Sequence, residues 1–311
     1  MNTTAWPDTR SWQSLVEGSS EATFFHTPLW HEIVVAAYRD YGIATRQFLF
    51  EDGARAVFPF IQTKKGGIIR GKSRLKSSVF GGYGGIIADR KLSPEQYRMM
   101  YRTITRLKAS VSVDTNPFTD ETLPDSFSAK HDYTQVSRLA AGDDCFIPKL
   151  SRGAKSNLNQ ARKKGVTVRV LTAEQDISAY YNIYLDTLKR WGDAVLFTYP
   201  EELFFTVYRL AGDHVRIWLA EKDSVIIAGA VIFYWNSIAS YWQGASLQDY
   251  FSCYPNNMLH MEIIRDAARR GYAYYDFGPS GGQEGVERFK KSFGAEKFSF
   301  DSGLLRYGKK K

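Results

Sequence analysis

The sequence has few of the residues that build metal sites and disulfide frameworks. Its 311 residues include two cysteines, Cys145 and Cys253, far apart in the chain, and five histidines without the spacing of a ligand pair. No apolar run is long enough to cross a bilayer, and the N-terminus lacks the basic and apolar segments of a signal peptide. We therefore expect a cytoplasmic protein with no metal and no tightly bound cofactor.

Acidic residues are also missing from two stretches, 53–88 and 145–173, in a chain of net charge +8. Positive charge without acidic neighbours predicts a polyanionic partner such as RNA, a nucleotide diphosphate or an anionic membrane surface. A solvated basic face explains either stretch taken alone. The lysines and arginines concerned are Arg55, Lys64, Lys65, Arg70, Lys72, Arg74 and Lys76 in the first stretch, and Lys149, Arg152, Lys155, Arg162, Lys163, Lys164 and Arg169 in the second.

The second half of the chain has the alternating signals of an α/β fold. Gly192, Gly212 and Gly271 each end a predicted helix, Pro200 opens one, and residues 172–175 form a capping-box pattern. The predicted order is β-α-α-β-β-β-α-β-α-β. We expect strands at 166–171, 215–221, 225–234, 238–245, 272–277 and 297–306, and helices at about 172–191, 200–212, 256–270 and 286–293.

The first half predicts a shortened version of the same order. Thr27 and Pro28 open one helix, and residues 93–96 open another with both a capping box and a proline. The repeated order predicts two similar modules, 1–145 and 146–311, joined through a basic helix at 151–164. We expect first-half helices at 11–17, 29–38 and from 93, and strands at 45–50, 55–61, 111–114 and 134–139.

Residues 272–294 combine a buried strand, a glycine-rich turn and a short helix that ends at Gly294. A strand that runs through glycines into a helix leaves backbone N–H groups pointing at open space, which suits an anion or a developing oxyanion. Gly278 and Ser280 belong to this turn and are candidates for binding a substrate phosphate. A flexible turn explains the same glycines equally well.

The helix that follows the turn has one apolar face, formed by Val286, Phe289 and Phe293. Two of its basic residues point away from this face, whereas Lys290 lies at the edge. A lysine beside the core can stabilise an oxyanion or hold a phosphate. Helix geometry by itself favours a lysine that extends along the core into solvent.

Two other regions hold candidate substrate contacts. Tyr83 lies at the centre of a glycine cluster, 81–85, and is either a wall of a substrate pocket or a turn tyrosine. Asn256 and Asn257 are expected to cap the helix that they begin, and capping alone explains them. Asp276 is expected to accept a hydrogen bond from a nearby N–H, and His260 to be a semi-buried structural histidine, so no general base stands out.

Four segments in this order resemble the Fem family, whose members build peptidoglycan interpeptide bridges, and its relatives with the acetyltransferase (GNAT) fold. The resemblance is good over about 145–307 and weak in the first half. It implies an α/β protein of tandem GNAT-like modules (the acyl-CoA N-acyltransferase fold), with mixed central sheets flanked by helices. The segments are the basic helix 150–165, the helix start at 254–264, Tyr-Asp-Phe-Gly-Pro at 275–279 and Phe-Lys-Lys-Ser-Phe-Gly at 289–294.

The resemblance implies transfer of an aminoacyl group from aminoacyl-tRNA to an amine of a peptidoglycan-precursor-like acceptor. It assigns transfer to Lys290 and recognition of the donor end to Phe289. The helix start at Tyr254, Asn256 and Asn257 would lie on the substrate side. The basic stretches, with Arg152, Lys155 and Arg162, would hold tRNA phosphates and the diphosphate of a nucleotide- or lipid-linked envelope precursor, with peripheral contact to the inner membrane face.

The sequence departs from the family patterns in several ways, so other interpretations of its function stay open. The first-module glycine cluster lacks the Pro-Arg-Gly-Pro pattern of bridge-forming members, and there is no helical-hairpin insertion. Residues 244–255 lack the glycine-rich loop with which GNAT enzymes usually bind CoA, which counts against acyl-CoA as donor. No serine elbow or Cys/His pair predicts a covalent nucleophile, so we expect direct attack by the amine. The alternatives are an acyl-CoA-dependent N-acyltransferase acting on an envelope polysaccharide or small amine, and a binding protein on the same scaffold.

Overall fold

The computed structural model describes residues 2–5, 8–63, 73–77, 79–140, 149–192, 195 and 197–307. Contacts divide the chain into two compact units. Unit 1 comprises Met1–Thr134 and Phe298–Lys311, and unit 2 comprises Gln135–Lys297. The predicted module boundary at 145/146 lies outside the described residues and stays a prediction. Four lysines and arginines of the first basic stretch, at 64–72, and Cys145 lie outside them as well.

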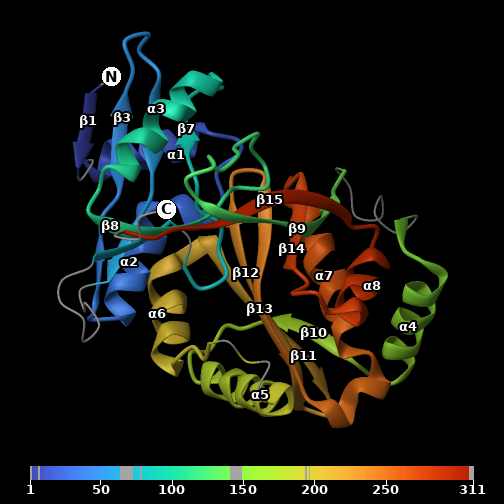
Figure 1. Cartoon of the computed structure of the whole chain (residues 1–311). Helices are drawn as coiled ribbons and strands as arrows, with labels where there is room; N and C mark the ends of the chain where they lie inside the picture. Colours follow the sequence, from blue (N-terminus) through green and yellow to red (C-terminus); the bar gives the residue numbers. More distant parts are fainter. Residues whose placement is uncertain are drawn as a thin grey trace. The chain divides into compact units, whose positions relative to one another are not determined.

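Unit 2 is built on a mixed sheet in the order β10-β11-β12-β13-β14 (Figure 1). The first four strands pair antiparallel, whereas β13 and β14 pair in parallel. A parallel pair needs a crossover connection, and helix α7 supplies it. The strands are β10 (Thr167–Val170), β11 (Val215–Lys222), β12 (Val225–Trp235), β13 (Ile238–Ser246) and β14 (Tyr274–Pro279).

Helices cover both faces of this sheet. On one face α7 (Pro255–Arg269) packs on the strands with α4 (Arg152–Lys163) beside it, and on the other lie α5 (Asp176–Trp191) and α6 (Glu201–Ala211). Successive side chains of β12 point to opposite faces of the sheet. Ile232 and Tyr234 belong to the core under α7, while Phe233 contacts Trp242. The unit also contains α8 (Glu284–Lys291) and the short 3-10 helices Gly212–His214 and Gln248–Cys253.

The predicted order of elements in the second half is confirmed, and so are most helix ends. Gly192 and Gly212 occupy the C-caps of α5 and α6, and Pro200 is the N-cap residue of α6. The capping box predicted at 172–175 is wrong, because α5 begins at Asp176 and has no side-chain cap. The Glu174 carboxylate accepts instead from Arg209 on α6, at 3.0 Å.

The described part of unit 1 contains two groups of strands and three helices. In one group the order is β1-β3-β4-β7; in the other, β15 pairs with β8, followed by β6, β5 and β2. The strands are β1 (Asn2–Ala5), β2 (Tyr41–Ile43), β3 (Arg46–Leu49), β4 (Arg55–Phe58), β5 (Ile61–Thr63), β6 (Ser73–Lys76), β7 (Ile87–Ala88) and β8 (Ala109–Asp114), while β9 (Ser128–Arg138) and β15 (Glu296–Leu305) run past the division between the units. The helices are α1 (Thr9–Gly18), α2 (Pro28–Ala37) and α3 (Pro94–Thr105), with a 3-10 turn at Phe24–His26.

The strand predicted at 55–61 is two strands, β4 and β5, in different groups. Pro59 lies between them, and a proline cannot donate to a ladder, so pairing ends there. The two predicted helix starts are confirmed: the Thr27 side chain caps α2, and Ser93 and Gln96 form a capping box on α3.

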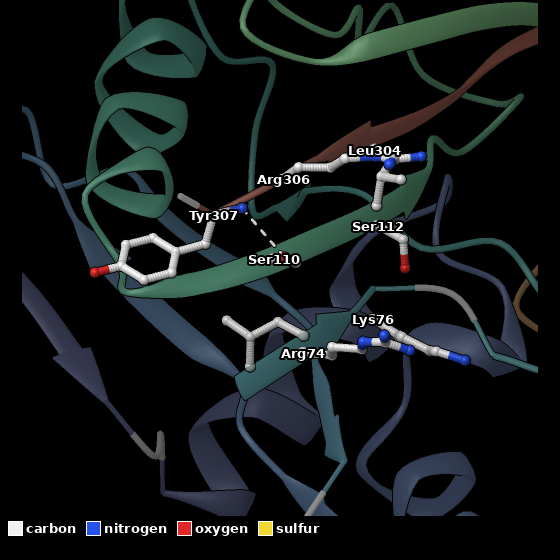
Figure 2. Close-up of a pocket in the computed structure, with 8 residues that line it drawn as sticks. Arg74, Lys76, Ser110, Ser112, Leu304, Arg306 and Tyr307 are labelled. Carbon is white, nitrogen blue, oxygen red and sulfur yellow. Dashed lines mark hydrogen bonds between the residues drawn. The ribbon is translucent and has the colours of Figure 1, made fainter. Parts of the chain in front are cut away.

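The two faces of β8 differ in character. Ala109, Val111 and Val113 belong to the core of unit 1, which includes residues of α3. The alternate residues Ser110 and Ser112 line a cavity on the other face (Figure 2). A hydrogen bond holds Tyr307, which follows β15, against this face: its backbone N–H donates to the Ser110 hydroxyl at 3.1 Å.

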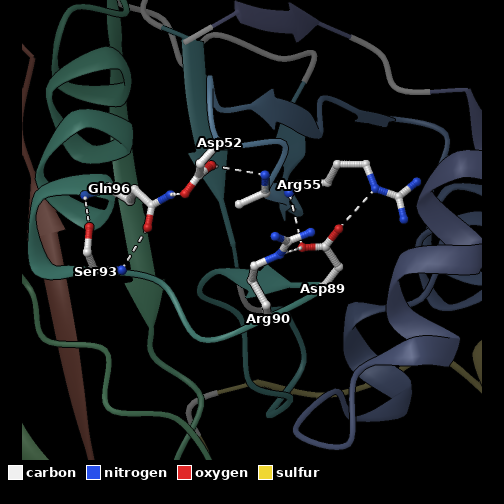
Figure 3. Close-up of polar contacts among 7 residues, drawn as sticks. Asp52, Arg55, Asp89, Arg90, Ser93 and Gln96 are labelled. Carbon is white, nitrogen blue, oxygen red and sulfur yellow. Dashed lines mark hydrogen bonds and ion pairs between the residues drawn. The ribbon is translucent and has the colours of Figure 1, made fainter.

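Polar contacts at the rim of unit 1 fix the start of α3 and the edge of β4 (Figure 3). The Gln96 side-chain amide, besides its part in the capping box, donates to Asp52 at 3.1 Å. Arg55 on β4 pairs with Asp89 at 3.0 Å, and Arg90 bonds the same carboxylate. Among the residues that the structure describes, no helix has both the length and the apolar character needed to cross a membrane.

Two glycine-to-alanine substitutions test the packing of unit 2. A Cβ at Gly229 on β12 would lie 2.6 Å from the Tyr180 ring and 3.0 Å from the Trp218 carbonyl oxygen. We expect Gly229→Ala to destabilise the protein by about 1–3 kcal/mol, the usual effect of overpacking. At Gly153 on α4 the nearest atom is 3.8 Å away, so Gly153→Ala should leave stability unchanged or raise it by up to about 1 kcal/mol. Thermal unfolding distinguishes the two, and equal effects would contradict this packing.

Candidate active site

The parallel strands β13 and β14 pair over only a short stretch. The paired residues are Ile238–Ser240 on β13 and Tyr274–Asp276 on β14. Directly afterwards β13 has a bulge, because Tyr241 and Gln243 pair with consecutive residues of β12 and leave Trp242 as the extra residue. A bulge bends a strand and ends regular pairing. The candidate site is built at the end of this paired stretch, where open α/β sheets commonly bind ligands.

Asp276 and Gly278 form the first part of the site. Asp276 is the last residue of β14 that pairs with β13, and it is 2% exposed. Its carboxylate accepts from the backbone N–H of Gly278 at 2.9 Å, which confirms the predicted role. Gly278 has φ of +72°, a conformation that glycine adopts most easily. Its amide, predicted to face an anion, is therefore occupied by a side chain of the protein.

Lys290 on α8 lies directly over the end of β14. Its side chain is buried, with 4% of the residue exposed. The Nζ atom donates to the carbonyl oxygens of Gly278 at 2.7 Å and Pro279 at 2.9 Å. Burial lowers the pKa of Lys290 to about 8, although the nearby Asp276 charge acts in the opposite direction. The predicted place beside the core is confirmed, and the lysine points inward rather than into solvent.

An aromatic shell surrounds this part of α8. The His260 ring lies 5.4 Å from Phe289 and 5.1 Å from Phe277. Its Nδ1 and the Tyr275 hydroxyl are hydrogen-bonded at 2.8 Å. Burial, with a contribution from the Lys290 charge, lowers the pKa of His260 to about 3. The histidine is neutral near pH 7 and a weak base, which agrees with the structural role predicted for it.

Gln135 joins the turn to α8, a contact that sequence reasoning missed. The Ser280 hydroxyl donates to the Gln135 side-chain oxygen at 2.7 Å, and the Gln135 amide donates to the Glu287 carbonyl oxygen at 3.1 Å. Ser280 is buried by this arrangement. No signal near residue 280 identifies Gln135, because the two residues are far apart in the chain and meet only through β9.

The N-terminus of α8 does not fit an anion, contrary to the sequence prediction. The first turn already carries two carboxylates, Glu284 and Glu287, which occupy the positive end of the helix in place of an anionic ligand. The carbonyl oxygens of the turn face Lys290, and the Gly278 amide faces Asp276. The positive group that faces the turn is the Lys290 ammonium.

The start of α7 also differs from the prediction. Tyr254 occupies the N-cap in a left-handed conformation, Pro255 is the first helical residue, and neither asparagine caps the helix. The Asn256 amide instead donates to the Ser246 hydroxyl on β13 at 3.2 Å, and Asn257 is buried. The ammonium of Lys164 lies 5.6 Å from the centre of the Tyr254 ring. Asn256 thus links the crossover helix to the strand that carries the bulge.

The basic helix α4 presents its charges to solvent. It buries Ala154, Leu158 and Ala161 against the core, while Arg152, Lys155 and Arg162 are exposed. Within the described ranges, none of these three cations forms an ion pair. The helix therefore offers an uncompensated positive face, as the sequence suggested.

Tyr83 belongs to unit 1, where it is part of the packed interior. It is 3% exposed and packs edge-on against Phe25 and Phe300, with ring centres 6.5 and 5.6 Å away. In the same glycine cluster, a Cβ at Gly84 would lie 2.1 Å from the Ser77 carbonyl oxygen. Close backbone packing therefore accounts for Gly84. Over the described part of the chain, no group of three His, Cys, Asp or Glu residues is placed to hold a metal ion.

Comparisons with known proteins agree with this architecture. Residues 149–291 match the family model described as an acetyltransferase (GNAT) domain. Lipid II:glycine glycyltransferases from two strains of Staphylococcus epidermidis are 23% identical over 205 residues, which cover 47% of this chain and 49% of each relative. The alignment thus spans about half the length of these curated relatives.

Solved structures extend the similarity to the whole chain. The crystal structure of FemX superposes with a TM-score of 0.70 at 13% identity and covers 97% of both chains. A tandem GNAT protein from the clavulanic acid biosynthesis pathway gives a TM-score of 0.55 at 8% identity, covering 100% of this chain and 99% of that one. The predicted tandem GNAT-like fold and the resemblance to the Fem family and GNAT-like acyltransferases are confirmed.

The lowered pKa of Lys290 predicts how stability depends on pH. Between about pH 8 and the ordinary lysine pKa of 10.5 the unfolded chain binds more protons at this residue than the folded chain. The free energy of unfolding contributed by Lys290 therefore rises with pH across this window. We expect the stability of the wild type relative to Lys290→Met to increase from pH 8 to 10.5, as measured by urea denaturation.

Lys291→Met is the matched control, because Lys291 is the exposed neighbour on the same helix. This variant removes one lysine charge from the solvent side of α8, so the difference between the two variants isolates the effect of burying the Lys290 ammonium. A difference that stays flat with pH would contradict the burial of this ammonium.

Proposed function

We propose that this Fem-like chain is an N-acyltransferase that moves an aminoacyl group from aminoacyl-tRNA to an amine of a cell-envelope acceptor. The acetyltransferase (GNAT) match, 149–291, contains α4, α7, β14 and Lys290 of α8. The similarity to lipid II:glycine glycyltransferases supports a nucleotide- or lipid-linked peptidoglycan precursor as the acceptor. The donor is a co-substrate, and the proposed reaction uses no metal and no tightly bound cofactor.

The observation that carries this proposal is the buried ammonium of Lys290 at the end of the β13–β14 pair. A lysine ammonium has three N–H donors, and the carbonyl oxygens of Gly278 and Pro279 take two of them. In the proposed reaction the third donates to the oxyanion of a tetrahedral intermediate. In a site surrounded by aromatic rings such a bond is worth more than in water, and it needs no reorganisation during the reaction.

The proposed reaction is direct attack. The acceptor nitrogen bonds to the carbonyl carbon of the aminoacyl ester, and the carbonyl oxygen becomes an oxyanion that accepts from Lys290. Collapse breaks the bond to the ribose oxygen, which leaves with the proton lost by the amine, and an amide remains. Trapping a covalent acyl-protein would contradict this scheme.

Substitution of Lys290 tests its role. We expect Lys290→Met to lower kcat by about 10²–10³, the usual effect of removing one oxyanion donor, with a smaller change in KM. Lys291→Met should retain near wild-type kcat. Aminoacyl transfer is followed with a radiolabelled donor, and circular dichroism confirms that each variant is folded. Full activity of a folded Lys290→Met protein would refute this role and favour a binding protein on the same scaffold.

The exposed face of α4 is proposed to hold tRNA phosphates, with peripheral contact to an anionic membrane surface as a further use of its charge. The triple variant Arg152→Gln, Lys155→Gln and Arg162→Gln should weaken tRNA binding and reduce the slope of log K against log salt by about one per lost phosphate contact. The control Arg102→Gln, Arg106→Gln and Lys108→Gln removes equal charge from α3 and the residues after it. Equal losses in both variants would show a non-specific field effect.

An acyl-CoA donor is the alternative, favoured by the acetyltransferase (GNAT) description of the matching family. In that case the acceptor would be an envelope polysaccharide or a small amine. Release of free thiol from acyl-CoA, corrected for hydrolysis and dependent on the acceptor, separates this donor from aminoacyl-tRNA.

A further inference from the structure

We propose that unit 1 carries a separate binding site for a phosphoryl anion on the outer face of β6, β8 and β15. The structure has a cavity of about 510 Å³ at this place (Figure 2). It does not involve Lys290 or any other residue of unit 2, so it stands independently of the proposed transfer reaction. Its lining comprises Arg74, Leu75, Lys76, Ser110, Ser112, Leu304, Arg306 and Tyr307.

The strand register explains why a cavity forms here. β8 is the middle strand, with β6 on one side and β15 on the other. Arg74 pairs with Ser110, Lys76 pairs with Ser112, and Leu304 pairs with Ser112 from the opposite side. Small serines on the middle strand form a floor, and long side chains on both neighbours form the walls. Because strands lie about 4.8 Å apart, the walls rise from backbones about 10 Å apart.

The charge of the cavity is positive and uncompensated. Three cations line it, Arg74, Lys76 and Arg306, and no acidic residue does. Within the part of the chain that the structure describes, none of the three forms an ion pair. The nearest acid along this face of β8 is Asp114, which pairs with Ser302 and does not line the cavity. Three cations that line one cavity without ion-pair partners favour a ligand with several negative charges.

The donor set fits phosphate chemistry. Two arginines supply planar, two-pronged donors and the lysine a point charge, the usual groups that bind phosphoryl oxygens. The Ser112 hydroxyl is a further donor, and Ser110, whose oxygen accepts from Tyr307 N–H, still has its own O–H to donate. Leu304 and Tyr307 add apolar surface on the β15 side, where a group attached to the phosphate can pack. A phosphate ester or diphosphate satisfies both parts of this lining.

Calorimetric titration with inorganic pyrophosphate at low salt tests the site. The triple variant Arg74→Gln, Lys76→Gln and Arg306→Gln should bind at least tenfold more weakly than the wild type. The control is Arg102→Gln, Arg106→Gln and Lys108→Gln, which removes the same charge from unit 1. The control residues lie on α3 or just after it, and α3 packs on the other face of β8. We expect the Kd of the control variant to be within about twofold of the wild-type Kd. No binding by the wild type, or equal weakening in both triples, would overturn the proposal.

Ser112→Leu tests whether binding needs the shape of the cavity as well as its positive charge. It fills the floor without changing any charge, so it should also weaken pyrophosphate binding by tenfold or more, with thermal unfolding confirming the fold. Wild-type affinity of a folded Ser112→Leu protein would refute a bound ligand in this cavity.

Vesicles containing 30% phosphatidylglycerol identify the source of the phosphate. Vesicle binding that pyrophosphate displaces, and that the cavity triple loses, assigns the site to a lipid headgroup. Pyrophosphate binding with no binding to vesicles assigns it to a soluble phosphate ester.

Discussion

The bonds from the Lys290 ammonium to the carbonyl oxygens of Gly278 and Pro279 hold the candidate active site together. A buried charge is strongly unfavourable unless hydrogen bonds and an opposite charge compensate it. Here the turn supplies two acceptors, and Asp276 supplies the charge. Helix α8, Glu284–Lys291, is too short to be stable alone. Its position therefore depends on this contact, on the Gln135 bridge and on the packing of Phe293.

The same surroundings connect stability and chemistry. The aromatic rings around α8 exclude water, which lowers the pKa of Lys290 and makes its remaining hydrogen bond stronger. They also keep His260 neutral. A donor of this kind suits a reaction in which negative charge appears on a carbonyl oxygen. It suits less well the permanent binding of a phosphate, for which the exposed cations of α4 and of the unit 1 cavity are better placed.

Positive charge thus occurs in two physical settings in this protein. On α4 the cations are exposed to solvent, where their attraction for an anion is long-ranged and weakened by salt. In the unit 1 cavity, cations from β6 and from the residue after β15 line a concave site with serines between them, so a ligand there must also fit the cavity. Each acid-free stretch of the sequence contributes to one setting: Arg74 and Lys76 of the cavity come from the first stretch, and Arg152, Lys155 and Arg162 of α4 from the second.

Local sequence signals succeeded where neighbours in the chain decide the structure. Helix ends at Gly192 and Gly212, the capping box of Ser93 and Gln96, and the place of Lys290 beside the core all follow from the turn or helix in which they lie. They failed where a distant partner competed, and the pattern at 172–175 shows this. Glu174 bonds to Arg209 of the next helix instead of capping its own.

The sequence by itself therefore determined the order of strands and helices in the second half, the resemblance to the GNAT-like acyltransferases and the place of Lys290 beside the core. Only the tertiary structure decided which groups meet that lysine, that Gln135 joins the turn to α8, and that Arg74, Ser110 and Arg306 share one cavity. The physical reason is the distance along the chain over which each interaction acts. Caps and periodicity act within a few residues, whereas strand register and the burial of charge depend on segments that are far apart in the chain and adjacent only after folding.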